Sequence, residues 1–175
     1  MRLFWSKGYE ATSISDLTDA MGIGVRSLYV AFGDKKALFD EVVEAYCLRY
    51  GGWIARALAE EPTAKQAIAR ILHEAAYEHT RPGRPRGCML LCAAGNTNSI
   101  DVAAQLRQIR DRDVVVYSQR IQADIDAGIL PPDADAASLA RYTGAVLQGI
   151  SQSARDGASR EELQRVAALA IQCWP

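Results

Sequence analysis

The chain has 175 residues, of which 49% are hydrophobic and 23% are charged, and its formal net charge at pH 7 is -1. This length can bury a substantial core without disulfides or metal, and no apolar run approaches the roughly 18 residues that cross a bilayer. The composition argues against a membrane protein and against a broad polyanion-binding surface, so we expect a soluble cytoplasmic protein with reduced cysteines.

The first predicted elements, in residues 12–38, are two short helices around a glycine turn, followed directly by a third helix. Ser13 and Asp16 can form a capping box at the start of the first helix, and Gly22 stands where a helix ends with positive φ. A third helix opened by Asp34 offers an apolar side on which the two short helices can pack. This is the layout of a helix-turn-helix DNA-binding unit.

Helical spacing with caps recurs to the end of the chain, whereas strand signals are nearly absent, so we predict an all-α fold. The helix opened by Asp34 should run until Pro62 restarts the chain. The segment RPGRPRG at residues 81–87 should be an exposed loop, because its two prolines and two glycines cannot continue a helix. Further helices are predicted at about 63–80, 88–94, 99–127, 135–156 and 159–174.

The last two predicted helices form a hairpin around Gly157. Their apolar residues exceed what one buried face needs, and the small residues between them would let a second copy approach closely. We therefore predict that the hairpin forms a homodimer interface. The predicted interface residues are Leu139, Tyr142, Val146, Ile150, Leu163, Val166 and Ala170.

An ordered set of residues runs without gaps through the N-terminal region between Phe4 and Tyr46: Phe4, Lys7, Gly8, Tyr9, Thr12, Ser13, Ile14, Ile23, Leu28, Tyr29, Phe32, Lys35, Ala37 and Leu38. This set resembles the signature of the tetracycline-repressor-like (TetR/AcrR-type) bacterial transcriptional regulators. The C-terminal part resembles that family only in outline.

The resemblance implies two domains, a three-helix helix-turn-helix head at residues 1–46 and a helical ligand-binding and dimerisation domain at residues 47–175. It further implies a homodimer that reads two half-sites of double-stranded operator DNA in successive major grooves. A small-molecule effector in the core would release the DNA. The resemblance also places Met1 inside the family's first helix, so the given stretch is expected to lack most of that helix. A true truncation would weaken the head and its DNA binding.

The residues that read bases must lie on the exposed side and N-terminal end of the second short helix, because inward-facing side chains cannot reach a base. The candidates are Gly24, Val25, Arg26, Val30 and Ala31. Only Arg26 among them can make a bidentate contact with guanine. The candidates for phosphate contacts are Thr12, Ser13, Ser27, Tyr29 and Lys35.

The effector pocket is expected among C-terminal helices that are too apolar to satisfy one another by packing. Its predicted lining residues are Trp53, Met89, Cys92, Ile109, Tyr117, Tyr142 and Gln148. This mainly apolar set indicates a hydrophobic or aromatic effector. The helix that starts at Asp34 joins head and pocket and is the predicted lever between them.

Two alternative functions remain open at this stage. Cys88 and Cys92 lie four residues apart and suggest a thiol-based redox or metal sensor, but two thiols make an incomplete metal site and neither His73 nor His79 lies in a ligand motif. The second alternative is a helical dimerisation module that does not bind DNA. No motif in the sequence places a nucleophile beside a base, so we predict no enzyme activity, no metal and no cofactor.

Overall fold

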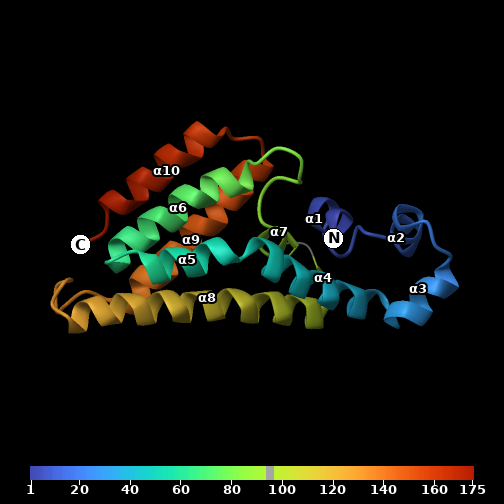
Figure 1. The fold of residues 1–175 in the computed structure, drawn as a ribbon, viewed down its shortest axis with the longest axis horizontal. Coiled ribbons are helices and arrows are strands. Elements are labelled where there is room, and N and C mark those ends of the chain that lie inside the picture. The colour runs from blue at the N-terminus through green and yellow to red at the C-terminus, as the bar shows by residue number, and fades with distance from the viewer. Residues whose placement is uncertain (94–96) are drawn as a thin grey trace.

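The computed structural model describes residues 1–93 and 97–175, and these residues form ten helices and no strand (Figure 1). The predicted all-α fold is confirmed. The helices are α1 (Arg2–Lys7), α2 (Ile14–Met21), α3 (Val25–Phe32), α4 (Lys35–Tyr50), α5 (Gly52–Glu60), α6 (Ala64–His79), α7 (Met89–Ala93), α8 (Ile100–Asp126), α9 (Ala136–Arg155) and α10 (Arg160–Gln172).

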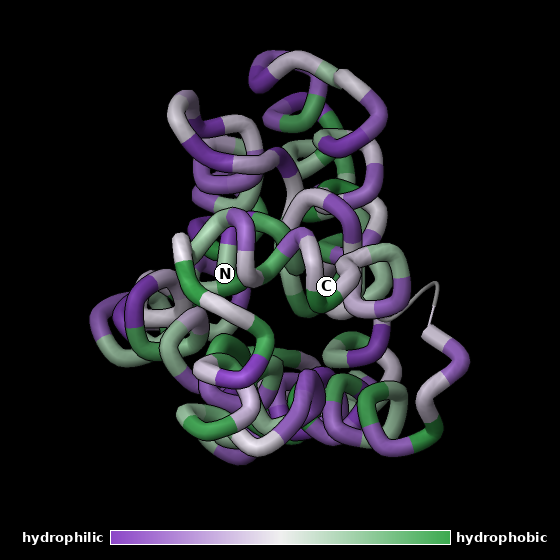
Figure 2. The backbone as a smooth tube through the Cα atoms, turned by 90° about the vertical axis from the view of Figure 1, so that its right-hand side faces the viewer, coloured by the Kyte–Doolittle hydropathy of each residue, from purple (hydrophilic) through white to green (hydrophobic). Residues whose placement is uncertain are grey.

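The molecule is elongated, with the head at one end and a bundle of long helices at the other (Figure 1). Helices α1, α2 and α3 form the head, α8 runs along one side of the molecule, and α6, α9 and α10 pack together at the far end. Hydrophobic and hydrophilic residues alternate along the helices, as expected when one side of each helix faces a core (Figure 2).

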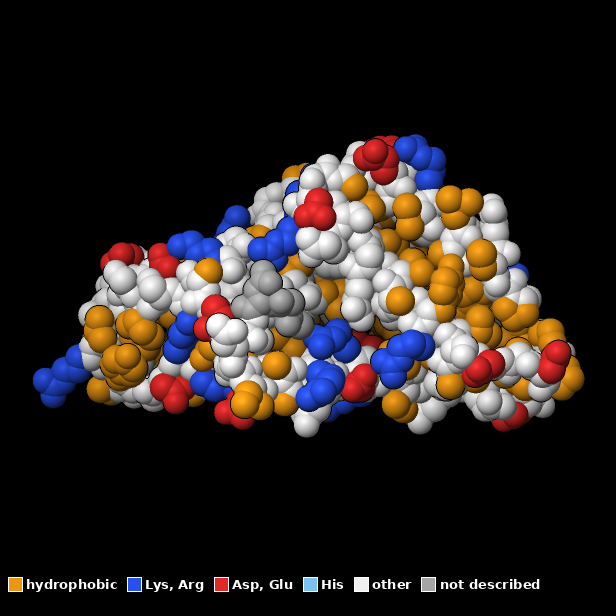
Figure 3. All heavy atoms as spheres, turned by 180° about the vertical axis from the view of Figure 1, so that it is seen from behind, with side chains coloured by type: hydrophobic (Ala, Val, Ile, Leu, Met, Phe, Trp, Pro, Cys, Tyr) orange, Lys and Arg blue, Asp and Glu red, His pale blue; other side chains and the backbone are white. Residues whose placement is uncertain are grey.

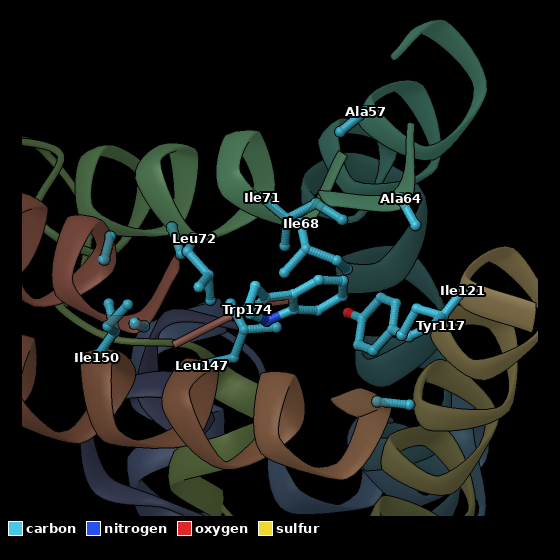
Figure 4. Close-up of a cluster of buried hydrophobic side chains, with 14 of the residues drawn as sticks. Ala57, Ala64, Ile68, Ile71, Leu72, Tyr117, Ile121, Leu147, Ile150 and Trp174 are labelled. Atoms are coloured by element: carbon cyan, nitrogen blue, oxygen red, sulfur yellow. The ribbon is translucent and has the colours of Figure 1, made fainter. Parts of the chain in front are cut away.

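Two hydrophobic cores hold the fold together. The larger one joins α6, α8, α9 and α10, and in it Trp174 lies between Ile68 and Ile71 of α6 and Leu147 of α9 (Figure 4). The smaller core starts in the head and continues through Phe39 of α4 to residues of α7 and α8. The head therefore packs against the rest of the chain, and the domain boundary predicted at residues 46/47 falls inside α4.

Several predicted helix ends match the structure for the expected reason. Ser13 and Asp16 form the predicted capping box, and Gly22 ends α2 in the left-handed conformation with φ 66°. The helix that starts after Asp34 is shorter than predicted, because it ends at Tyr50 and α5 starts at Gly52. A Cβ atom on Gly51 would lie 2.6 Å from the carbonyl oxygen of Cys47, so only glycine fits this junction.

The loop at residues 81–87 is less exposed than predicted. It lies beside α1, and the Arg2 guanidinium donates a hydrogen bond of 2.8 Å to the carbonyl oxygen of Gly83. Gly87 at its end is buried. The following helix, predicted at residues 88–94, is α7 at Met89–Ala93, and Ala94 lies outside the described residues.

Among the helices that the structure describes, none is long and apolar enough to span a bilayer.

Candidate DNA-binding head and effector cavity

The head is built around two short helices whose ends the sequence fixes. The Ser13 hydroxyl accepts a hydrogen bond of 3.0 Å from the amide of Asp16, and the Asp16 carboxylate accepts one of 2.9 Å from the amide of Ser13. Leu17 of α2 and Leu28 of α3 are buried and anchor both helices to α4. This packing fixes which side of α3 faces solvent.

The outer side of α3 presents one cation among apolar side chains. Arg26 is exposed, and no hydrogen bond or ion pair to its side chain is found within the described residues. Val25 and Tyr29 are also exposed, and Val30 is 80% exposed. Hydrophobic side chains gather at the head end of the surface (Figure 3). This side of α3 can offer a guanidinium to a base edge and apolar contacts to thymine methyl groups.

The five predicted phosphate contacts are not equivalent. Ser13, Ser27 and Tyr29 are exposed at the head. Lys35 is half-buried, because its ammonium lies 4.4 Å from the centre of the Tyr9 ring, and burial lowers its pKa. The prediction for Thr12 is wrong. Its side chain is 0% exposed, and its hydroxyl donates a hydrogen bond of 2.7 Å to the carbonyl oxygen of Gly8, so it holds the turn after α1.

A cavity of about 1150 Å³ lies between α4, α5, α8, α9 and the loop at residues 81–87. Four of the seven predicted lining residues are on its wall, namely Trp53, Ile109, Tyr117 and Gln148. The other three predicted residues do not line the cavity and make contacts elsewhere. Met89 is buried in the smaller core, Cys92 lies against Ser151, and the Tyr142 hydroxyl donates a hydrogen bond of 3.1 Å to the carbonyl oxygen of Ala170.

The cavity wall is more polar than the sequence predicts. His79 is 7% exposed, its Nδ1 has no hydrogen-bond partner within the described residues, and burial lowers its pKa to about 4. Asp113 is also on the wall, and burial raises the pKa of its carboxyl to about 6. Both groups are pushed towards their neutral forms, and both can exchange hydrogen bonds with a polar group on a ligand.

Two wall residues also belong to the contact between head and core. Trp5 comes from α1 of the head, and Arg84 comes from the loop at residues 81–87. The Arg84 guanidinium lies 5.6 Å from the centre of the Trp5 ring and 5.1 Å from that of Tyr50, and it also pairs with Glu78. This arrangement could not be predicted from the sequence, because no local pattern links residues about eighty positions apart.

The environment of the thiols does not favour the sensor that the first alternative requires. Cys88 accepts a hydrogen bond of 3.4 Å from the Tyr46 hydroxyl, and burial raises the pKa of its thiol, which disfavours the reactive thiolate. Cys92 lies 3.8 Å from the Ser151 hydroxyl. In the part of the chain that the structure describes, no three His, Cys, Asp or Glu side chains come together as a metal site.

The predicted dimer residues divide into two groups. The prediction is wrong for three of them, Ile150, Leu163 and Ala170, because these side chains are buried in the larger core of their own chain. Leu139, Tyr142 and Val146 are half-buried, and Val166 is 46% exposed. Leu169, which was not predicted, is 60% exposed on α10. Unpartnered apolar side chains therefore lie on the outer side of the hairpin.

The chain is similar to known regulators over nearly its whole length. The model of the bacterial regulatory proteins of the tetR family matches residues 1–42. The HTH-type transcriptional repressor ComR of Escherichia coli (strain K12) is 34% identical over 181 residues, which cover 100% of this chain and 85% of that protein. The HTH-type transcriptional repressor BdcR of the same organism is 30% identical over 175 residues, which cover 96% of this chain and 81% of that protein.

The fold is also similar to that of a regulator of known structure. A cysteine mutant of the TetR family transcriptional regulator CifR, complexed with a 26-base-pair double-strand operator DNA, superposes with a TM-score of 0.93 at 35% sequence identity. The superposition covers 99% of this chain and 92% of that chain.

Proposed function

The chain belongs to the TetR family of bacterial regulatory proteins, and we propose that it is a transcriptional repressor that binds operator DNA as a homodimer and leaves it when a small molecule binds. The observation that carries the proposal is the exposed outer side of α3, with Arg26 in the first turn of that helix. The operator complex of the CifR mutant supports DNA binding by a chain of the same fold. Such a repressor acts where the chromosome is, in the cytoplasm.

In the proposed complex, α3 lies in the major groove. Arg26 donates two hydrogen bonds to a guanine, and Val25 and Val30 press on thymine methyl groups. Ser13, Ser27, Tyr29 and Lys35 contact phosphates and position the head without reading sequence. Because Arg26 is the only charged residue among the candidate base readers, we expect only a few base pairs of each half-site to be recognised specifically.

The homodimer is proposed to form through the outer side of the α9–α10 hairpin. Val166 and Leu169 are exposed there, and Leu139 and Val146 are half-buried. A two-fold pairing of this surface would cover these apolar side chains and hold two heads at a fixed separation.

The effector is proposed to bind in the cavity of about 1150 Å³. Trp53, Ile54 and Tyr117 favour an aromatic or aliphatic body, and His79 and Asp113 favour a polar group on the same molecule. An effector lowers DNA affinity only if it binds better to a form whose heads do not fit the operator. Helix α4 lines the cavity and packs against the head, which supports its role as the lever.

The test is a binding experiment on the wild-type chain. Duplexes are first selected from random DNA, and the dissociation constant is then measured by fluorescence anisotropy at two salt concentrations. We expect specific binding that weakens steeply with salt, because phosphate contacts release counterions. A dimer that selects no sequence would refute the proposal and support the dimerisation module.

A further inference from the structure

The turn between α1 and α2 is tied to the start of α8 by one carboxylate. Glu10 Oε1 accepts hydrogen bonds of 2.9 Å from the Thr97 hydroxyl, 2.9 Å from the Asn98 amide and 3.1 Å from the Ser99 amide. Ser99 is the N-cap residue of α8. The bond from Thr97 is the main cause of the lowered pKa of Glu10, so the carboxylate is ionised at neutral pH.

A second bond ties the head to the last turn of α9. The Arg155 guanidinium donates a hydrogen bond of 2.9 Å to the carbonyl oxygen of Ser6 in α1. Glu10 and Arg155 thus connect the head to two different core helices, and α8 and α9 themselves pack closely on each other. The two bonds together restrict rotation of the head about either helix.

Head orientation has a direct consequence in a dimer that reads two half-sites. The half-sites of such operators lie about 34–36 Å apart, one helical turn, so a rotation of either head changes the separation of the two reading helices. Neither Glu10 nor Arg155 is on α3, so neither is placed to read a base.

We propose that Glu10 and Arg155 are positioning residues that set the half-site spacing accepted by the dimer. The inference rests on the proposed function, since it requires a dimer that binds operator DNA. It assigns the two residues a role in spacing selectivity that is separate from the base contacts of Arg26.

The experiment uses a duplex selected from random DNA by the wild-type chain, together with duplexes in which one base pair is added or removed between the half-sites. Dissociation constants are measured for the wild type, Glu10→Ala, Arg155→Ala and the double variant. Glu10→Gln is the matched control for charge, because its amide oxygen can still accept hydrogen bonds. Glu161→Ala, an exposed site on α10, is the control for a general loss of a carboxylate.

We expect the wild type to bind the altered duplexes at least tenfold more weakly than the selected one. Glu10→Ala and Arg155→Ala should reduce this ratio at least threefold, and the double variant should reduce it further. Glu10→Gln and Glu161→Ala should keep the wild-type ratio. A purely structural role would weaken binding to all duplexes alike and leave the ratio unchanged.

An unchanged ratio in the two alanine variants overturns the inference and leaves the proposed function intact. If the wild type selects no DNA, the proposed function fails and the inference fails with it. Thermal melting identifies any variant that does not fold. Arg155→Ala removes an exposed side chain at a helix end and is expected to fold. If Glu10→Ala is unfolded, the ratio measured for Arg155→Ala alone decides the test.

Discussion

The indole Nε1 of Trp5 donates a buried hydrogen bond of 3.0 Å to the carbonyl oxygen of Gly87, which joins α1 of the head to the end of the loop at residues 81–87. Gly87 is confined at this point. It has φ 76°, and a Cβ atom there would lie 2.8 Å from the carbonyl oxygen of Ser151 in α9. The bond therefore connects the head to a segment that packs tightly against α9, where the Cys88 amide also donates a hydrogen bond of 2.8 Å to the Ser151 hydroxyl.

Replacement of Trp5 by Phe should destabilise the head. The ring keeps an apolar surface, but the carbonyl oxygen of Gly87 loses its donor in a buried place, which costs about 1–3 kcal/mol. The free energy of unfolding from urea titration measures this cost. Tyr29→Phe, a similar change at an exposed site, is the control. Equal stability of Trp5→Phe and the wild type would show that the bond contributes nothing.

Replacement of Arg26 by Ala should weaken binding to the selected operator and relax its sequence preference. A bidentate contact with guanine contributes about 1–3 kcal/mol of discrimination, so the preference for guanine at one position should largely disappear. Anisotropy measured on the selected duplex and on single-base variants tests this. Arg56→Ala, on the exposed side of α5, should bind like the wild type. If Arg26→Ala keeps the guanine preference, Arg26 does not read the base.

Replacement of Asp113 by Asn should stabilise the chain at neutral pH. Burial raises the pKa of Asp113 from 3.8 to about 6, so the folded state holds the proton more tightly than the unfolded state does. The destabilisation by the buried charge is therefore absent below the unfolded pKa, grows as pH rises from about 4 to about 6, and stays constant above.

Because Asn removes that charge, Asp113→Asn should gain about 1–2 kcal/mol at about pH 7.5 and nearly nothing at about pH 4. Thermal melts of both proteins at the two pH values measure the difference. A gain of equal size at both values would indicate a packing effect and exclude the titration of Asp113.

Replacement of both Val166 and Leu169 by Lys should break the proposed dimer. These side chains are exposed in the single chain, so the charges would disturb a pairing surface without entering the core. Light scattering after size exclusion should show a monomer with unchanged helical circular dichroism. Ile129→Lys, at an exposed site beyond the end of α8, should remain a dimer. A dimeric double variant would place the interface elsewhere.

The sequence predicted most of the head because its signals are local. Ser13 with Asp16 and Gly22 act within a few residues of the helix ends that they fix, so spacing alone located α2 and the turn. The buried side of the α9–α10 hairpin was harder to predict. Both sides of α9 and α10 carry apolar residues, and periodicity cannot say which side meets α6. Periodicity therefore places Ile150 and Leu163 in the dimer interface, whereas in the structure they face the core.

The contacts between head and core could not be predicted for a different reason. Glu10 meets Thr97 across 87 positions, and Trp5 meets Gly87 across 82. A single sequence carries no pattern for pairs so far apart, and each residue alone looks like an ordinary surface glutamate or core aromatic. The same holds for Asp113, whose position on the cavity wall depends on how α4, α8 and α9 are arranged around the cavity.

Trp5 and Arg84 constrain any attempt to turn this protein into a biosensor for a new compound. Under the proposed function, a change at either residue is expected to alter both the binding of the compound and the contact between head and core, so a library built there would mix loss of repression with gain of response. Leu58 and Leu147 lie on the same cavity wall and pack in the larger core, which contains no residue of the head. Selections for new inducers should begin at those two positions.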